Sequence, residues 1–235
     1  IFYSKSSSKD LPKIFLISFI STIILTLIRD KSLIFGLRYL RGGSDGIIHE
    51  GHSLSIFQNL IEGNIMNALI GGEPAFYYMP GLRYFNALGK FFFGDTNFLY
   101  ILIVMFLPII VYFILKNLCN RKYAWVCFLS FIFFPILENM GFGYFNYVWQ
   151  MARNHAETMA ITFFALSIYL IIKKIQIKEI TNNKFKEYFF SFLITILLAF
   201  SVILRPNFFP GASILFFFIF FTILFYHKIK ESLIS

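Results

Sequence analysis

The sequence has few charged residues and almost no cysteine. Only 14% of its 235 residues are charged, whereas 58% are hydrophobic and 34 are Phe. A soluble domain of this length has no core large enough to bury so many apolar side chains, so the composition excludes an ordinary soluble enzyme and indicates an integral membrane protein. The two cysteines, Cys119 and Cys127, are too few for a disulfide framework or a zinc site.

The hydrophobic residues fall into separate runs long enough to suggest membrane helices. We place six runs, at residues 14–28, 97–115, 124–137, 156–172, 189–204 and 208–226. The first run is not followed by a small-residue cleavage site, so we interpret it as an anchor. The sequence therefore predicts one all-α membrane domain over residues 1–235, with about six transmembrane helices and a long first loop at 29–96. Because the chain begins with Ile and stops soon after a hydrophobic run, we expect it to be part of a longer protein.

The distribution of charge predicts the orientation. Thirteen of the 21 basic residues and four of the 12 acidic residues, a net of +9, lie in the segments 1–13, 116–123, 173–188 and 227–235. Basic loops remain on the cytoplasmic side, so the loop at 29–96 and the segments 138–155 and 205–207 are expected to share the opposite face. The excess of basic residues therefore indicates how the chain is oriented in the membrane, and no nucleic-acid partner is expected. The location that fits best is the bacterial inner membrane, with the polar loop facing the periplasm.

The long loop holds half of the acidic residues, namely Asp30, Asp45, Glu50, Glu62, Glu73 and Asp95. Within it, residues 46–63 have a helical pattern that suits a helix lying on the membrane surface. Its apolar stripe is formed by Ile47, Leu54, Phe57 and Ile61, and the opposite stripe by Asp45, His49, His52, Ile56 and Asn59. This register favours Asp45 over Glu50 as the acidic residue that faces a cavity.

Several short motifs of this loop resemble a known group of enzymes. They are Asp45 followed by Glu50, the sequence LIEG at 60–63, GEP at 72–74 and YYMPG at 77–81. Together they resemble the GT-C superfamily of multi-span glycosyltransferases, which includes aminoarabinose and protein O-mannosyl transferases, over roughly residues 13 to 172. That family often has two adjacent acidic residues. Here Asp45 is followed by Gly46, which leaves the choice of base open between Asp45 and Glu50.

The resemblance implies an activity and a set of site residues. The expected reaction moves a sugar from a polyprenyl-phosphate donor to an acceptor hydroxyl, with inversion, on the non-cytoplasmic face. The expected partners are the lipid-linked sugar, membrane lipid and an acceptor glycan, lipid or protein. Asp45 is the expected base, with Glu50 as second choice. The residues expected to bind the substrate or its lipid phosphate are Arg83, Arg205, Arg153, Glu157, His155, Tyr77, Tyr78 and Asn207.

Each assignment has a structural alternative. Asp45 also suits the cap of a surface helix, and Arg83 beside Tyr77 and Tyr78 also suits an interfacial aromatic belt. Arg153 and Glu157 are spaced to pair at i and i+4, and Arg205 before Pro206 can simply extend towards the membrane interface.

A metal is the one cofactor that the pattern allows. Asp45, His49 and His52 stand at i, i+4 and i+7, but these three residues do not complete a ligand set and a solvated polar face explains them equally well. Two other functions stay open: a transporter or flippase of lipid-linked sugars, and a polysaccharide polymerase or ligase. A transporter is expected to have charged residues near the middle of its spans and internal repeats, and neither feature is found in this sequence.

Overall fold

In a computed structural model, the residues described are 10–29, 44–71, 80–134, 143–178 and 184–232. This part of the chain is helical throughout and contains no strand, which confirms the predicted all-α class. The helices are α1 (Leu11–Arg29), α2 (Ser44–Ile61), α3 (Ile65–Ile70), α4 (Gly81–Phe93), α5 (Phe98–Leu118), α6 (Arg121–Phe133), α7 (Tyr144–Ala152), α8 (Glu157–Lys178), α9 (Lys184–Leu204), the 3₁₀ turn η4 (Pro206–Phe208) and α10 (Phe209–Ser232).

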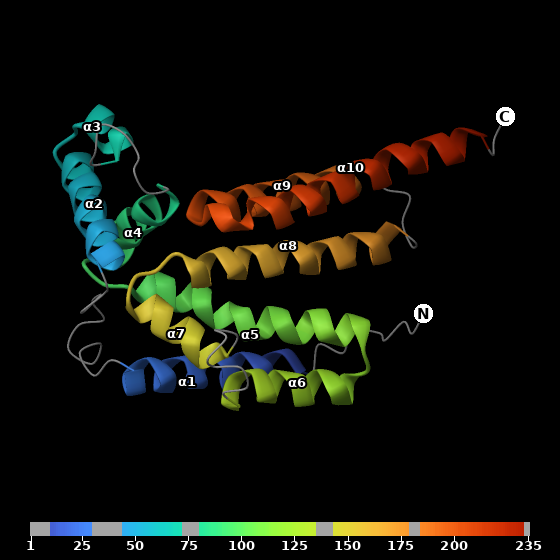
Figure 1. The fold of residues 1–235 in the computed structure, drawn as a ribbon, viewed down its shortest axis with the longest axis horizontal. Helices are drawn as coiled ribbons and strands as arrows, with labels where there is room; N and C mark the ends of the chain where they lie inside the picture. The colour runs from blue at the N-terminus through green and yellow to red at the C-terminus, as the bar shows by residue number, and fades with distance from the viewer. Residues whose placement is uncertain (1–9, 30–43, 72–79, 135–142, 179–183, 233–235) are drawn as a thin grey trace.

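Six helices lie side by side and three cross one end of them. Figure 1 shows α1, α5, α6, α8, α9 and α10 running along the long axis, while α2, α3 and α4 form a layer at one end, with α2 roughly perpendicular to the bundle. The turn from α7 to α8 and the turn from α9 through η4 to α10 lie at this same end. We call it the layer end.

Four helices are long and apolar enough to cross a membrane: Leu11–Ile28, Phe98–Leu118, Glu157–Gln176 and Glu187–Leu204. These helices correspond to four of the six predicted runs, namely 14–28, 97–115, 156–172 and 189–204. The third run, 124–137, corresponds to α6, whose 13 residues span only about 20 Å at 1.5 Å per residue. The sixth corresponds to η4 and the 24-residue α10, of which the part with described side chains, Pro206–Phe221, is apolar. A bilayer core of roughly 30 Å needs about 20 residues.

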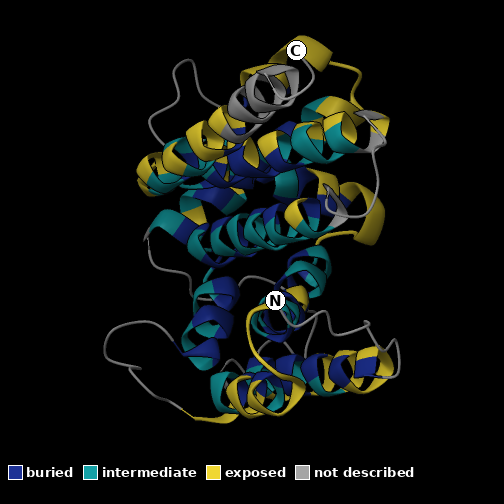
Figure 2. Ribbon diagram, turned by 90° about the vertical axis from the view of Figure 1, so that its right-hand side faces the viewer, coloured by how far each residue is buried: buried dark blue, intermediate teal, exposed yellow. Residues whose placement is uncertain are grey.

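The bundle is held by apolar packing and by hydroxyl groups that bond within it. Leu82, Tyr100, Val104 and Phe128 are among the completely buried residues of the main core, and Figure 2 shows the buried stripes facing inward. On α1, the Ser18 hydroxyl donates to the Met105 carbonyl at 2.5 Å. Hydroxyl groups inside apolar surroundings need such partners, so these bonds fix the position of α1 against α5.

The end of the bundle opposite the layer is closed by a cluster of charges around Asp10, which is almost completely buried. Arg121 donates to both Asp10 oxygens, from Nε at 2.9 Å and from Nη2. The Tyr112 hydroxyl donates at 2.9 Å and the Lys116 ammonium lies at 3.5 Å. We call this the basic end, because Lys116, Arg121 and Lys173 all lie there.

Candidate functional site

The layer end brings together four parts of the chain that are far apart in sequence. They are the first turn of α2, the buried face of α4, the turn at residues 153–156 and the turn at Arg205. Sequence analysis predicted that these segments share one face. The structure confirms that they meet at one end of the bundle, where polar backbone that is not part of a regular helix can be covered by protein.

The register of α2 differs from the predicted one by one residue. The face buried against the rest of the layer carries Gly46, His49, Ser53 and Ile56, whereas the predicted polar stripe ran through Asp45, His49, His52 and Ile56. Asp45 lies half-buried in the first turn, where a carboxylate also interacts favourably with the helix dipole. Ile47 and Ile61 are exposed, as expected for the outward apolar stripe.

A buried asparagine joins the layer to the α7–α8 turn. Asn154 is completely buried and has a left-handed backbone conformation, with φ of 56°. Its Nδ2 donates to the Gly46 carbonyl at 3.1 Å, and its Oδ1 accepts from Asn86 Nδ2 at 2.8 Å. At Gly46 a side chain has no room, because a Cβ there would lie 2.1 Å from the Arg153 carbonyl oxygen.

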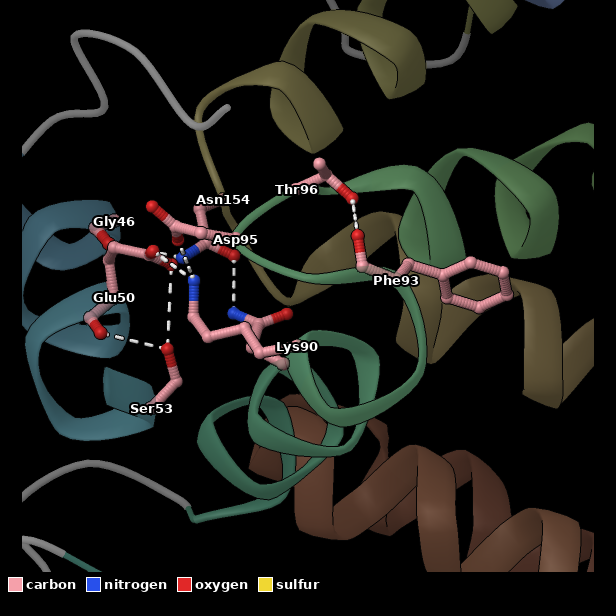
Figure 3. Close-up of polar contacts among 9 residues, drawn as sticks. Gly46, Glu50, Ser53, Lys90, Phe93, Asp95, Thr96 and Asn154 are labelled. Carbon is pink, nitrogen blue, oxygen red and sulfur yellow. Dashed lines mark hydrogen bonds and ion pairs between the residues drawn. The ribbon is translucent and has the colours of Figure 1, made fainter. Parts of the chain in front are cut away.

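A buried lysine links α2, α4 and the turn between α4 and α5. Lys90 is 2% exposed, and its ammonium donates to Glu50 Oε1 and, at 2.6 Å, to Asp95 Oδ1 (Figure 3). Ser53 also lies beside the Glu50 carboxylate, at 3.5 Å. Glu50, the second choice for the base, is therefore engaged in an ion pair that holds the layer together.

His49 lies at the centre of the charged groups of this end. Burial and, to a smaller extent, the charge of Arg83 together lower the pKa of its imidazole from 6.5 to about 4, while Asp45 opposes both effects. His52 and His155 also contribute electrostatically. At neutral pH the imidazole of His49 is therefore uncharged.

Arg83 lies deeper than the sequence suggested. It is completely buried on α4, and its Nη1 donates to the Gly71 carbonyl at 3.0 Å, where it joins the end of α3 to α4. The Arg83 side chain therefore lies inside the layer and does not extend into solvent. Tyr84 holds the same two helices, since its hydroxyl donates to the Leu69 carbonyl at 2.6 Å.

Glu157 pairs with Arg205 and not with Arg153. Arg205 Nη2 lies 2.7 Å from Glu157 Oε1, and their side chains are 39% and 29% exposed. The buried Nε of Arg205 makes no hydrogen bond within the described part of the chain. Arg153 instead lies over the Trp149 ring at 4.7 Å, and His155 meets the same ring edge-on at 6.3 Å.

The remaining predicted site residues are not gathered into this arrangement. Asn207 is exposed in η4. Tyr77 and Tyr78 lie outside the described residues. Within the described ranges no group of three or more His, Cys, Asp or Glu side chains is placed to hold a metal, so Asp45, His49 and His52 do not form a ligand set.

Sequence analysis missed Asn86, Lys90 and Asn154. A signal for two of them was present, because Arg83, Asn86 and Lys90 recur at i, i+3 and i+7 and so share one face of a helix. That polar stripe predicts a buried polar face on α4. Asn154 gave no such signal.

Comparison of the chain with protein-family models, curated proteins and solved structures finds no match.

Proposed function

We propose that this chain is part of a membrane glycosyltransferase of the GT-C type. It moves a sugar from a polyprenyl-phosphate donor to an acceptor hydroxyl, with inversion, at the layer end of the bundle. Following the charge distribution, the layer end faces the periplasm of a bacterial inner membrane.

The observation that carries the proposal is the concentration of ionisable side chains at the layer end. Asp45 and His49 on α2, His155 and Glu157 beside the α7–α8 turn, and Arg205 after α9 all belong to it. Ionisable residues that gather in the interior of a membrane protein are candidates for a functional site, and here they come from segments that are far apart in the sequence.

The chemistry of sugar transfer fits the types of residue present. The acceptor hydroxyl must lose a proton, which a carboxylate can take. We assign this role to Asp45, because the carboxylate of Glu50 already holds Lys90. The departing lipid phosphate needs a cation more than an acid. Arg205 suits this role because a guanidinium can donate two parallel hydrogen bonds to a phosphate.

A transporter or flippase of lipid-linked sugars fits less well. Along α1, α5, α8 and α9 the Lys, Arg, Asp and Glu residues lie near the helix ends and leave the middle of each helix uncharged. Substrate and coupling-ion sites of transporters lie near the membrane midplane, at broken helices. A polysaccharide polymerase or ligase of a different membrane fold would also act on the non-cytoplasmic face, and the assay of sugar transfer asks whether a polyprenyl-phosphate sugar is the donor.

The test is sugar transfer by the purified protein in lipid nanodiscs, with polyprenyl-phosphate sugars as donors. We expect Asp45→Asn to lower the transfer rate by ~10²–10⁴-fold, the usual contribution of a general base, without loss of folded protein. The matched control is Glu62→Gln, since Glu62 is an exposed acidic residue next to the same helix. Activity of Asp45→Asn within a few-fold of that of the control would remove Asp45 from the mechanism. Absence of transfer by the unmodified protein with every donor would contradict the proposed function.

A further inference from the structure

We propose that Asn154 is the positioning residue of this site: it fixes the first turn of α2, and with it Asp45, against the turn that carries Arg153, His155 and Glu157. The inference rests on the proposed function for its catalytic consequence. The attachment of α2 to the turn is argued from the contacts of Asn154 alone.

The backbone of Asn154 is held in a conformation that few residues adopt. Among the described residues it is the one non-glycine with positive φ. Asn tolerates the left-handed region better than most residues, but the conformation still costs energy and persists only where its surroundings determine it. Here the surroundings are α7, whose Met151 carbonyl accepts from the Asn154 N–H at 2.9 Å, and complete burial of the side chain.

The side chain of Asn154 uses both of its polar groups on different helices. The donor binds the carbonyl of Gly46, 108 residues away, and the acceptor binds the amide of Asn86, 68 residues away. A buried side-chain amide whose donor and acceptor are both hydrogen-bonded has one favourable orientation. Rotating it would leave a polar group unpaired, which costs free energy. Asn154 therefore holds α2 and α4 to the turn at the same time.

The contact at Gly46 makes this attachment close. With a Cβ excluded by the Arg153 carbonyl oxygen, the α2 backbone lies directly against the backbone of the turn. Asp45 precedes Gly46, and Arg153 and His155 flank Asn154. A shift at this contact therefore moves the proposed base relative to the basic residues of the turn. A displacement of about 1 Å can lower a rate by roughly 10²-fold.

The test uses Asn154→Gly, which allows the left-handed backbone and removes both side-chain hydrogen bonds. Two quantities are measured in nanodiscs: amide hydrogen exchange over residues 44–50, and kcat and KM for sugar transfer. We expect exchange at the first turn of α2 to rise by about 10-fold, the equivalent of one buried hydrogen bond. We expect kcat to fall about 10- to 100-fold, while KM for the donor changes by less than about threefold. The control is Asn59→Ala, which removes a side-chain bond within α2, from Asn59 Nδ2 to the Ser55 carbonyl.

The outcomes separate the parts of the proposal. Unchanged exchange over residues 44–50 overturns the attachment, and raised exchange with wild-type kcat overturns the positioning role. If Asn154→Gly does not fold, Asn86→Ala is measured in its place; a smaller rise in exchange supports the proposal and no rise overturns it. If the unmodified protein transfers no sugar, the proposed function fails, and the exchange measurement still decides whether Asn154 holds α2.

Discussion

The two ends of the bundle use charged residues in different ways. At the basic end, one buried carboxylate is surrounded by Arg121, Tyr112 and Lys116, and its hydrogen-bonding capacity is satisfied within the protein. At the layer end, the pairs are spread over α2, α4, α8 and the turn at Arg205, and the Arg205–Glu157 pair is partly exposed. A buried carboxylate whose partners all lie within the protein stabilises a fold, even though the Arg121 side chain is exposed, whereas a pair in which the carboxylate is itself partly exposed leaves capacity for a ligand.

The comparison predicts that the basic end serves stability and the layer end serves function. A change at one end should therefore leave the property of the other end unaffected.

The largest effect on stability is expected from Asp10→Asn. This change removes the shared acceptor and leaves the Lys116 ammonium and the Tyr112 hydroxyl buried without it, which we expect to lower the free energy of unfolding by about 2–4 kcal/mol. Denaturant unfolding of the detergent-solubilised protein measures the change. Sugar transfer per folded molecule should stay at the wild-type value, because Asp10 binds Arg121 at the start of α6, and this end of α6 lies opposite the layer (Figure 1). A loss of transfer in the folded fraction would show that the two ends are coupled.

The stability of the two ends should depend on pH in different ranges. Unfolding restores the pKa of His49 from about 4 to 6.5, so the unfolded state binds more protons between these values. The stability contributed by neutral His49 is therefore complete above pH 6.5 and is lost as the pH falls towards 4; at pH 5 the loss is about 2 kcal/mol. The charged and titratable groups around His49 are Asp45 and His52 on α2, Arg83 on α4 and His155 on the turn.

The basic end should not respond in that range. Burial raises the pKa of Asp10, but hydrogen bonds from Arg121 and Tyr112 outweigh burial and hold it below 3.8. Its stabilising contribution is present above about pH 4 and is lost only as the pH falls through the lowered pKa. Hydrogen exchange at pH 7 and pH 5, corrected for the intrinsic rate, should show faster opening of α2 and unchanged opening at the end of α5 and the start of α6. His49→Gln should abolish the difference, and its persistence would assign the effect to another group.

What could be predicted from the sequence depended on patterns that involve many residues. Long apolar runs and the alternation of basic loops each sum over dozens of side chains, so the helical class and the meeting of distant segments at one end followed from them. The prediction of which face of α2 is buried depended on only a few residues. Giving weight to Asp45, His49 and His52 moved the buried face by one position, because the small residues Gly46 and Ser53, which allow close packing, carry no hydrophobic signal.

Pairing between charged residues could not be predicted for the same reason. Arg153 and Glu157 have the spacing of a helical pair, but a break at Asn154 separates Arg153 from α8 and leaves Glu157 to Arg205, 48 positions further on. Lys90 precedes three Phe residues and resembles an interfacial lysine. Its burial depends on Glu50 and Asp95 meeting it in space, which no local pattern records.

The smallest expected effect separates a binding site from an anchor at Arg205. The pair with Glu157 is partly exposed, so it contributes at most about 1 kcal/mol to stability, and Arg205→Lys, which retains the charge, should leave unfolding almost unchanged. A lysine cannot supply the paired donors of a guanidinium, however, and we expect it to weaken binding of a polyprenyl-phosphate sugar by about 1–2 kcal/mol. Donor affinity in nanodiscs measures this change, with Arg121→Lys at the basic end as the matched control. If both lysine variants bind the donor like the wild type, Arg205 anchors the helix end and the lipid phosphate binds elsewhere. If only Arg205→Lys loses affinity, the functional difference between the two ends is established at a single guanidinium group.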